Sequence, residues 1–99
     1  MSRTDEAKQI IEAVREGNFR ITLHGGLRAL ERTLSNAEIQ NIAHTLIEWK
    51  WQATKGTHLF IGWINANQGG GFVAKVENGV VIVTVFRRKL KAHQKARKS

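Results

Sequence analysis

The pattern of apolar and polar positions divides this chain into a helical first half and a strand-rich second half. Apolar residues recur at helical spacing between positions 7 and 14, and Thr4 and Gly17 are suited to begin and end a helix there. A second, short helix is expected over residues 27–33. A third is predicted to begin at the Ser35–Glu38 capping box and to bury the apolar face that follows it.

Alternation of apolar and polar residues replaces helical spacing after residue 46. An earlier segment, residues 19–23, also alternates and is expected to be a short strand or an extended lead-in. The later strands are predicted over residues 47–53, 58–64, 72–77 and 80–88. The glycine-rich segment 65–71 between them is expected to form a flexible loop.

These elements predict the fold class α+β, with the N-terminal helices packed on one face of a four-stranded antiparallel sheet. Residues 1–88 are expected to form a single domain, because 99 residues supply one modest core. Residues 89–99 are expected to form a basic C-terminal tail.

The dipeptide Asn78-Gly79 predicts a tight hairpin, and the hairpin predicts the register of its two strands. A two-residue turn would place Glu77 opposite Val80. The face expected to pack on the helices then carries Phe72, Ala74, Val76, Val81, Val83 and Val85. The other face is expected to be open or half-open and to present Lys75, Thr84 and Arg88. Arg87 has core-side parity but lies at the end of its strand.

Charge is distributed unevenly. The formal net charge is +8; residues 1–50 carry seven basic and seven acidic side chains, whereas residues 51–99 carry nine basic side chains and one acid, Glu77. Such an excess attracts a polyanion and weakens with salt, so RNA is the expected partner. The alternative is a solubilising tail that binds nothing specific.

Several classes of protein are disfavoured by composition. The chain has no cysteine and no apolar run of membrane-spanning length, and its N-terminus is too polar for a signal peptide. A cytoplasmic protein without membrane contact is therefore expected. The histidines lack metal-ligand spacing and the predicted sheet lacks a carboxylate cluster, so neither a metal site nor a cofactor is expected.

What remains is a set of groups suited to cleaving RNA without a metal ion. In that reaction the 2′-hydroxyl attacks the phosphate, so the protein must move protons and stabilise the charged phosphorane. Histidine, arginine and threonine suit these tasks. The catalytic candidates are His24, Arg28, Thr84 and Arg87. For His24, a role limited to capping a backbone group is the competing interpretation.

Further basic and aromatic residues are candidates for holding RNA. They are Arg32, Lys50, Lys75, Phe86, Arg88, Lys89 and Lys91. Arg32 is alternatively a partner of Glu31. Trp49 and Trp51 share a predicted strand face with Ile47, which favours core roles for both, whereas Trp63 could be either buried or exposed.

Two stretches resemble a family of small bacterial domains. One runs from Ile21-Thr22-Leu23-His24 through Arg28 and Glu31-Arg32 to the Ser35 capping box, and the other is the final strand, residues 79–87. In the order of its elements the family is similar to the RelE-like (barnase–EndoU–colicin–RelE) ribonucleases. The resemblance implies a toxin acting on transfer RNA or ribosome-bound messenger RNA and neutralised by an acidic antitoxin or immunity protein. By position, His24, Arg28 and Arg87 match the recurring polar residues.

Two other functions stay open at this stage. One is a non-catalytic RNA- or ribosome-binding module that uses the same basic surface. The other is a protein-binding factor whose basic face docks an acidic partner. Cleavage that requires a histidine favours the ribonuclease, whereas salt-sensitive binding without cleavage favours the binding module.

Overall fold

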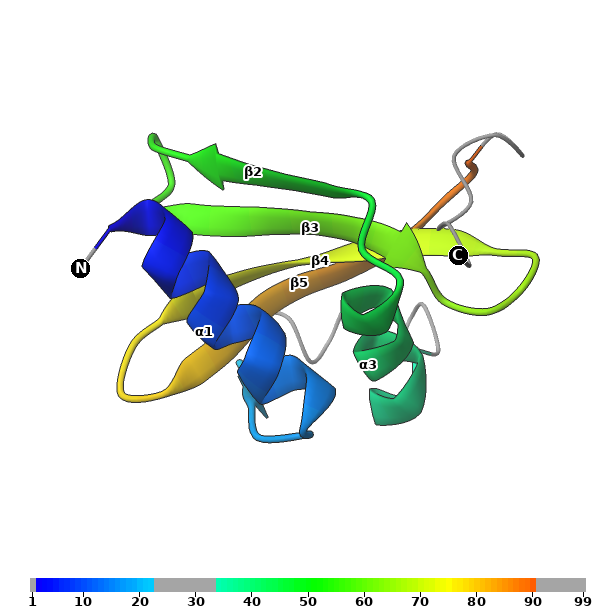
Figure 1. The fold of residues 1–99 in the computed structure, drawn as a ribbon, viewed down its shortest axis with the longest axis horizontal. Helices are drawn as coiled ribbons and strands as arrows, with labels where there is room; N and C mark the ends of the chain where they lie inside the picture. Colours follow the sequence, from blue (N-terminus) through cyan, green and yellow to red (C-terminus); the bar gives the residue numbers. More distant parts are fainter. Residues whose placement is uncertain (1, 23–33, 91–99) are drawn as a thin grey trace.

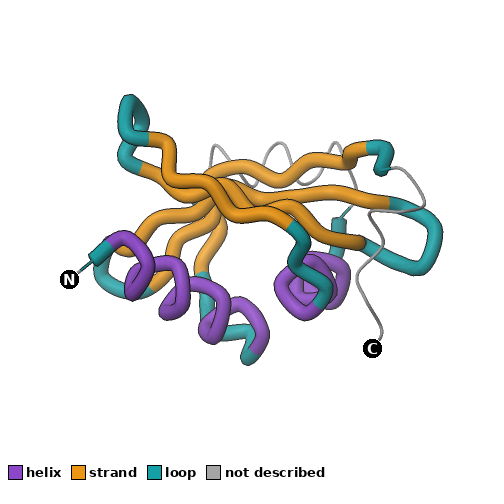
Figure 2. The backbone as a smooth tube through the Cα atoms, turned by 45° about the horizontal axis from the view of Figure 1, so that its top comes forward, coloured by secondary structure: helices purple, strands orange, loops and turns teal. Residues whose placement is uncertain are grey.

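The computed structural model describes residues 2–22 and 34–90. These residues form an α+β fold in which both described helices lie against the same face of one sheet (Figures 1 and 2). Helix α1 spans Arg3–Arg15 and helix α3 spans Asn36–His44. The predicted packing of helices on one sheet face is confirmed, and the expected helix over residues 27–33 lies outside the described residues.

Both helices begin at a serine. Ser35 and Glu38 form the predicted capping box: the Ser35 hydroxyl accepts the Glu38 amide N–H, and the Glu38 carboxylate accepts the Ser35 amide N–H. Helix α1 begins earlier than predicted, because Ser2 rather than Thr4 is its N-cap and accepts from the Asp5 amide. Either hydroxyl suits the position, so propensity alone did not distinguish them.

The described residues form a five-stranded mixed sheet in the order β1-β5-β4-β3-β2, not four antiparallel strands. The strands are β1 Arg20–Ile21, β2 Glu48–Gln52, β3 Thr57–Trp63, β4 Gly69–Val76 and β5 Val80–Arg88. Strands β2 to β5 are the expected antiparallel meander. The addition is β1, which pairs in parallel with β5 through Arg20 opposite Val81.

The three consecutive glycines lie in strand β4, which corrects the loop predicted for residues 65–71. A Cβ atom at Gly71 would lie 2.5 Å from the Phe60 carbonyl oxygen and from the Phe86 ring. A Cβ at Gly70 would meet the Ile64 side chain at the same distance. Glycine is used here because neighbouring groups approach the backbone too closely for any side chain.

The β4–β5 hairpin keeps the predicted register at its far end and loses it near the turn. Val73 pairs with Thr84 as expected, but Val76, not Glu77, pairs with Val80. The cause of this one-residue shift in register is a bulge in β5 at Val83, which has no pairing partner on β4. One extra residue reverses which side chains face the helices on the turn side of the bulge.

The bulge corrects the predicted core. Phe72, Ala74 and Val85 join the cluster under the helices as expected, but Val80 and Ile82 take the places predicted for Val81 and Val83. The remaining fully buried members come mostly from the helices and β3, namely Ile10, Val14, Ile39, Ile42, Ala43 and Phe60.

The opposite side of the sheet, here called the outer sheet face, is only partly open. Register places Leu59, Val73, Thr84, Phe86 and Arg88 on it. Ile61, Trp63 and Val81 also lie outside the helix-packed cluster, yet all three are buried. The expectation of an open face therefore fails at these three positions. Of the residues expected to be presented on this face, Arg88 is exposed, and Lys75 and Thr84 are half-buried.

Candidate nucleic-acid interface

The end of β5 presents consecutive basic side chains to solvent. Arg87, Arg88 and Lys89 are all exposed. Because side chains alternate along a strand, Arg88 belongs to the outer sheet face with Thr84 and Phe86, whereas Arg87 points to the helix-packed side. The two adjacent arginines therefore lie on opposite sides of the sheet.

The side chains of Phe86 and Thr84 already make contacts within the sheet. The Phe86 ring covers Gly71, in the space where a Cβ would otherwise lie, and the side chain is half-buried. The Thr84 hydroxyl donates to the Val83 carbonyl oxygen at 2.8 Å. Phe86 thus offers part of its ring for stacking, and Thr84 keeps its oxygen lone pairs for accepting a hydrogen bond.

Lys50 and Lys75 lie on the outer sheet face but apart from the end of β5. Lys50 is on the edge strand β2, in one row with Leu59, Val73 and Thr84. Three strand spacings separate Lys50 from Thr84, or about 14 Å between backbones. Lys75 forms an ion pair with Glu77 at 2.9 Å, and this contact lowers the pKa of the Glu77 carboxyl. The structure therefore does not gather these lysines into one compact cluster with Arg88.

The other predicted site residues, His24, Arg28, Arg32 and Lys91, lie outside the described residues. Of the four catalytic candidates, the structure describes Thr84 and Arg87. They are three positions apart on β5 and project to opposite sides of the sheet.

A buried histidine network that the sequence did not predict joins α1 to the β2–β3 hairpin. His58 Nδ1 accepts the indole N–H of Trp49 at 2.9 Å, and His58 Nε2 lies 3.0 Å from a Glu6 carboxylate oxygen. Since Nδ1 accepts, the neutral ring carries its proton on Nε2 and donates it to Glu6. All polar atoms of this buried ring are satisfied, which indicates a structural role.

Aromatic rings surround this network. Trp51 lies 4.7 Å from His58 between ring centroids, and the Arg3 guanidinium sits 4.0 Å above the Trp51 ring. Trp49 is 37% exposed, which contradicts its predicted core role, and Trp63 is the buried tryptophan. The edge position of β2 explains the exposure, because no described strand covers its outer side.

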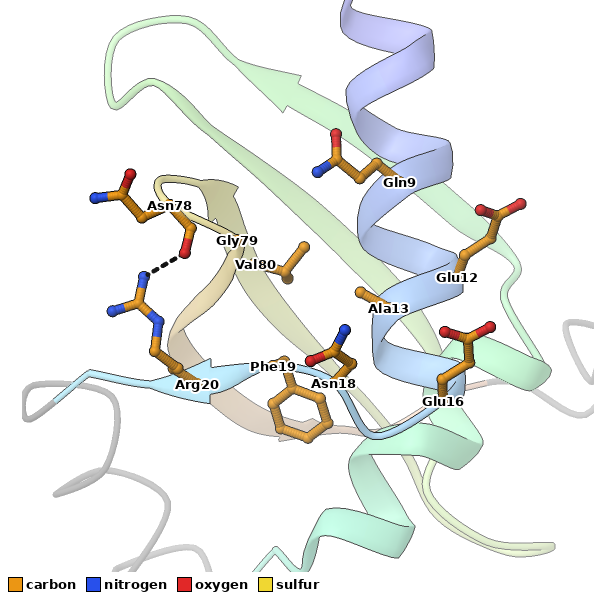
Figure 3. A pocket seen from close by; sticks show the side chains of 10 residues that line it. All are labelled: Gln9, Glu12, Ala13, Glu16, Asn18, Phe19, Arg20, Asn78, Gly79 and Val80. Carbon is orange, nitrogen blue, oxygen red and sulfur yellow. Dashed lines mark hydrogen bonds between the residues drawn. The ribbon is translucent and has the colours of Figure 1, made fainter.

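A pocket of about 380 Å³ opens between the second half of α1 and the β4–β5 turn (Figure 3). Glu12 and Glu16 line one wall, and Phe19 and Arg20 line the other. The Arg20 guanidinium is already used, because it donates to the backbone carbonyls of Glu77 and Asn78. The charged residues of the lining are two glutamates and this engaged arginine, so the pocket offers no available cation to an RNA phosphate.

Two further kinds of feature are absent from residues 2–22 and 34–90. No group of three histidine or carboxylate side chains gathers there to hold a metal ion. No helix among these residues is long and apolar enough to cross a bilayer.

Comparison with known proteins returned no match: no family model, no curated protein and no solved structure is significantly similar to this chain.

Proposed function

We propose that this protein is a metal-independent, toxin-type endoribonuclease that holds RNA at the basic end of β5 and in the tail that follows. The observation that carries the proposal is the pair of consecutive cations at the end of β5. Arg88 and Lys89 are exposed and form no ion pair with the described residues. Cations of this kind are available to phosphates without breaking contacts of the fold.

The three described arginines that precede β2 have structural partners. Arg3 pairs with Glu6 and covers Trp51. Arg15 donates to the Ala43 carbonyl, and Arg20 holds the β4–β5 turn. Lys8, Lys50 and Lys55 are also exposed and form no ion pair with the described residues, but they lie apart from one another. Arg88 and Lys89 are instead consecutive and adjoin the tail, which adds Lys91, Lys95, Arg97 and Lys98 to the same end of the sequence.

For cleavage we assign His24 to proton transfer, and Arg28 and Arg87 to stabilising charge on the phosphorane. Thr84 projects to the opposite side of the sheet from Arg87, so we assign it to a neighbouring phosphate of the RNA and not to the one that reacts. This assignment rests on residue chemistry and on the resemblance to RelE-like ribonucleases. The substrate class is transfer RNA or ribosome-bound messenger RNA, and an acidic antitoxin or immunity protein would cover the same cations to inhibit the enzyme.

The test is incubation of the purified full-length chain with total RNA and with ribosomes, with and without a chelator. Cleavage that survives chelation, leaves 2′,3′-cyclic phosphate ends and is lost in His24→Ala supports the proposal. Cleavage that stops on chelation contradicts the metal-free mechanism. Salt-sensitive binding with intact RNA on every substrate identifies a binding module instead.

A further inference from the structure

Strand β2 lies at one edge of the sheet that the described residues form. Among the described residues it pairs with β3 alone, in continuous register from Glu48 to Gln52 (Figure 1). Glu48, Trp49 and Lys50 are all exposed, so the edge is accessible. An edge strand carries a row of outward N–H and C=O groups that can pair with another strand unless proline, a bulge or a cover prevents it. The chain has no proline, and β2 has no bulge.

The side chains of β2 are complementary to themselves in one register. When two β2 strands run antiparallel with Trp49 opposite Trp49, each Glu48 lies opposite a Lys50 of the other copy. Opposite charges in such cross-strand positions stabilise pairing, and like charges directly opposite destabilise it. The register centred on Lys50 would instead place two lysines face to face.

We propose that β2 pairs antiparallel with β2 of a second copy of this chain, with the two-fold axis beside Trp49. The pairing joins the two five-stranded sheets into one continuous sheet and places the helices of both copies on the same face. It also covers Trp49, the large apolar side chain that is most exposed among the described residues, at 37%. The hydrogen bond to His58 already holds this indole in position, which reduces the entropy lost on pairing.

The short edge predicts a weak, reversible dimer. Strand β2 has five residues, so the interface is small, and the dimer should appear with rising protein concentration rather than persist on dilution. In this arrangement Lys50 contacts the second subunit and is not primarily an RNA ligand.

Sedimentation velocity of the full-length chain, without RNA, over a range of concentrations tests the proposal. Lys50→Glu should shift the equilibrium toward monomer, because each Glu48 then faces a glutamate. The double variant Glu48→Lys/Lys50→Glu should restore dimerisation, since the exchanged pair is again complementary. Lys55→Glu makes the same charge change in an exposed turn and should leave the dimer unaltered. A wild type that stays monomeric at every concentration, or a double variant that does not recover, overturns the proposal.

Disulfide trapping tests the register directly, because the chain has no cysteine of its own. Trp49→Cys places two thiols across the axis, where opposed Cβ atoms lie about 4.5–5.5 Å apart and small adjustments permit a bond. Gln52→Cys, also on β2, is the matched control, since it keeps Glu48 and Lys50 and residue 52 does not face itself in this register. Oxidation should cross-link Trp49→Cys and not Gln52→Cys, and the reverse result would contradict the proposed register. Pairing with the strand of a different protein would leave both variants uncross-linked.

Discussion

The indole N–H of Trp49 donates to His58 Nδ1 at 2.9 Å, and this contact determines which ring nitrogen of His58 faces Glu6 with a proton. These contacts connect the start of α1 to the β2–β3 hairpin, in which His58 lies 52 positions after Glu6. Because His58 is only 1% exposed, water cannot readily replace either partner. The network therefore couples the first turn of α1 to the open edge of the sheet.

Replacing His58 should destabilise the protein without affecting RNA binding. His58→Leu places an apolar side chain in the buried site. It leaves the Trp49 N–H without its partner and removes one of the two partners of the Glu6 carboxylate, which keeps Arg3. We expect a loss of about 1–3 kcal/mol in the free energy of unfolding, measured by urea denaturation. His44→Gln is the matched control, because His44 is exposed at the end of α3, where a change should cost only a few tenths of a kcal/mol. Equal losses in the two variants would contradict the structural role of His58.

Glu6 should make stability depend on pH in the acidic range. The hydrogen bond from His58, opposed by partial loss of hydration and reinforced by Arg3, holds the pKa of Glu6 below its ordinary value of 4.5. The unfolded chain therefore takes up the proton first as pH falls. The stability contributed by the carboxylate is complete above pH 4.5 and is lost as pH falls through the lower pKa of the folded state.

The measurement is the urea midpoint of the wild type and Glu6→Gln from about pH 6 to about pH 3. The wild-type midpoint should fall more steeply through this range, so the difference between the two proteins should shrink toward acid. Glu77, whose pKa Lys75 also lowers, contributes equally to both curves and cancels in the difference. A constant difference across the range would show that Glu6 stabilises the fold by other means.

Local patterns predicted the elements of this fold better than they predicted its register. The Ser35 capping box and the meander of β2 to β5 follow from short-range signals, and the structure contains both. The bulge at Val83 has no sequence signal, because valine suits either face of a strand. Alternation over residues 19–23 indicated a short strand or extended segment, but nothing in it indicated that β1 joins the sheet and pairs in parallel with β5, some sixty positions away.

The same distinction applies to candidate chemistry. The uneven distribution of charge along the sequence indicated the basic end of β5, since Arg88 and Lys89 are consecutive in sequence. His58 and Glu6 are 52 positions apart, and each lies in an ordinary amphipathic pattern, so nothing local indicated their contact. The available signal was the core-side parity that His58 shares with Phe60, which marks a buried polar group that needs a partner.

Arg87 and Arg88 should have separable roles, because the sheet directs them to opposite sides. Arg88→Ala should weaken RNA binding and reduce the salt slope by about 0.7 for a single-stranded contact. Arg87→Ala, the matched control for loss of one positive charge, should lower the cleavage rate with a smaller effect on affinity. Filter binding across a salt series, together with single-turnover cleavage, separates the two effects. Identical consequences in both assays would mean that only total charge matters.

The tail after β5 should strengthen RNA binding and contribute little to stability, provided that the truncation retains Leu90. The Leu90 side chain occupies the space beside Gly69, where a Cβ would lie 2.5 Å from it, so removal from residue 89 onward would also disturb the end of the sheet. Deleting residues 91–99 instead removes four basic side chains, Lys91, Lys95, Arg97 and Lys98. We expect the urea midpoint to change little, while RNA affinity falls. The log–log salt slope of binding should become shallower by up to about 2.8, since each lost contact on a single strand removes about 0.7.

A full-length variant with these four residues changed to glutamine is the control, because it retains the length of the tail and loses only its charge. Both proteins should bind RNA equally weakly, and a glutamine variant that binds like the wild type would show that the charge of the tail is incidental to binding.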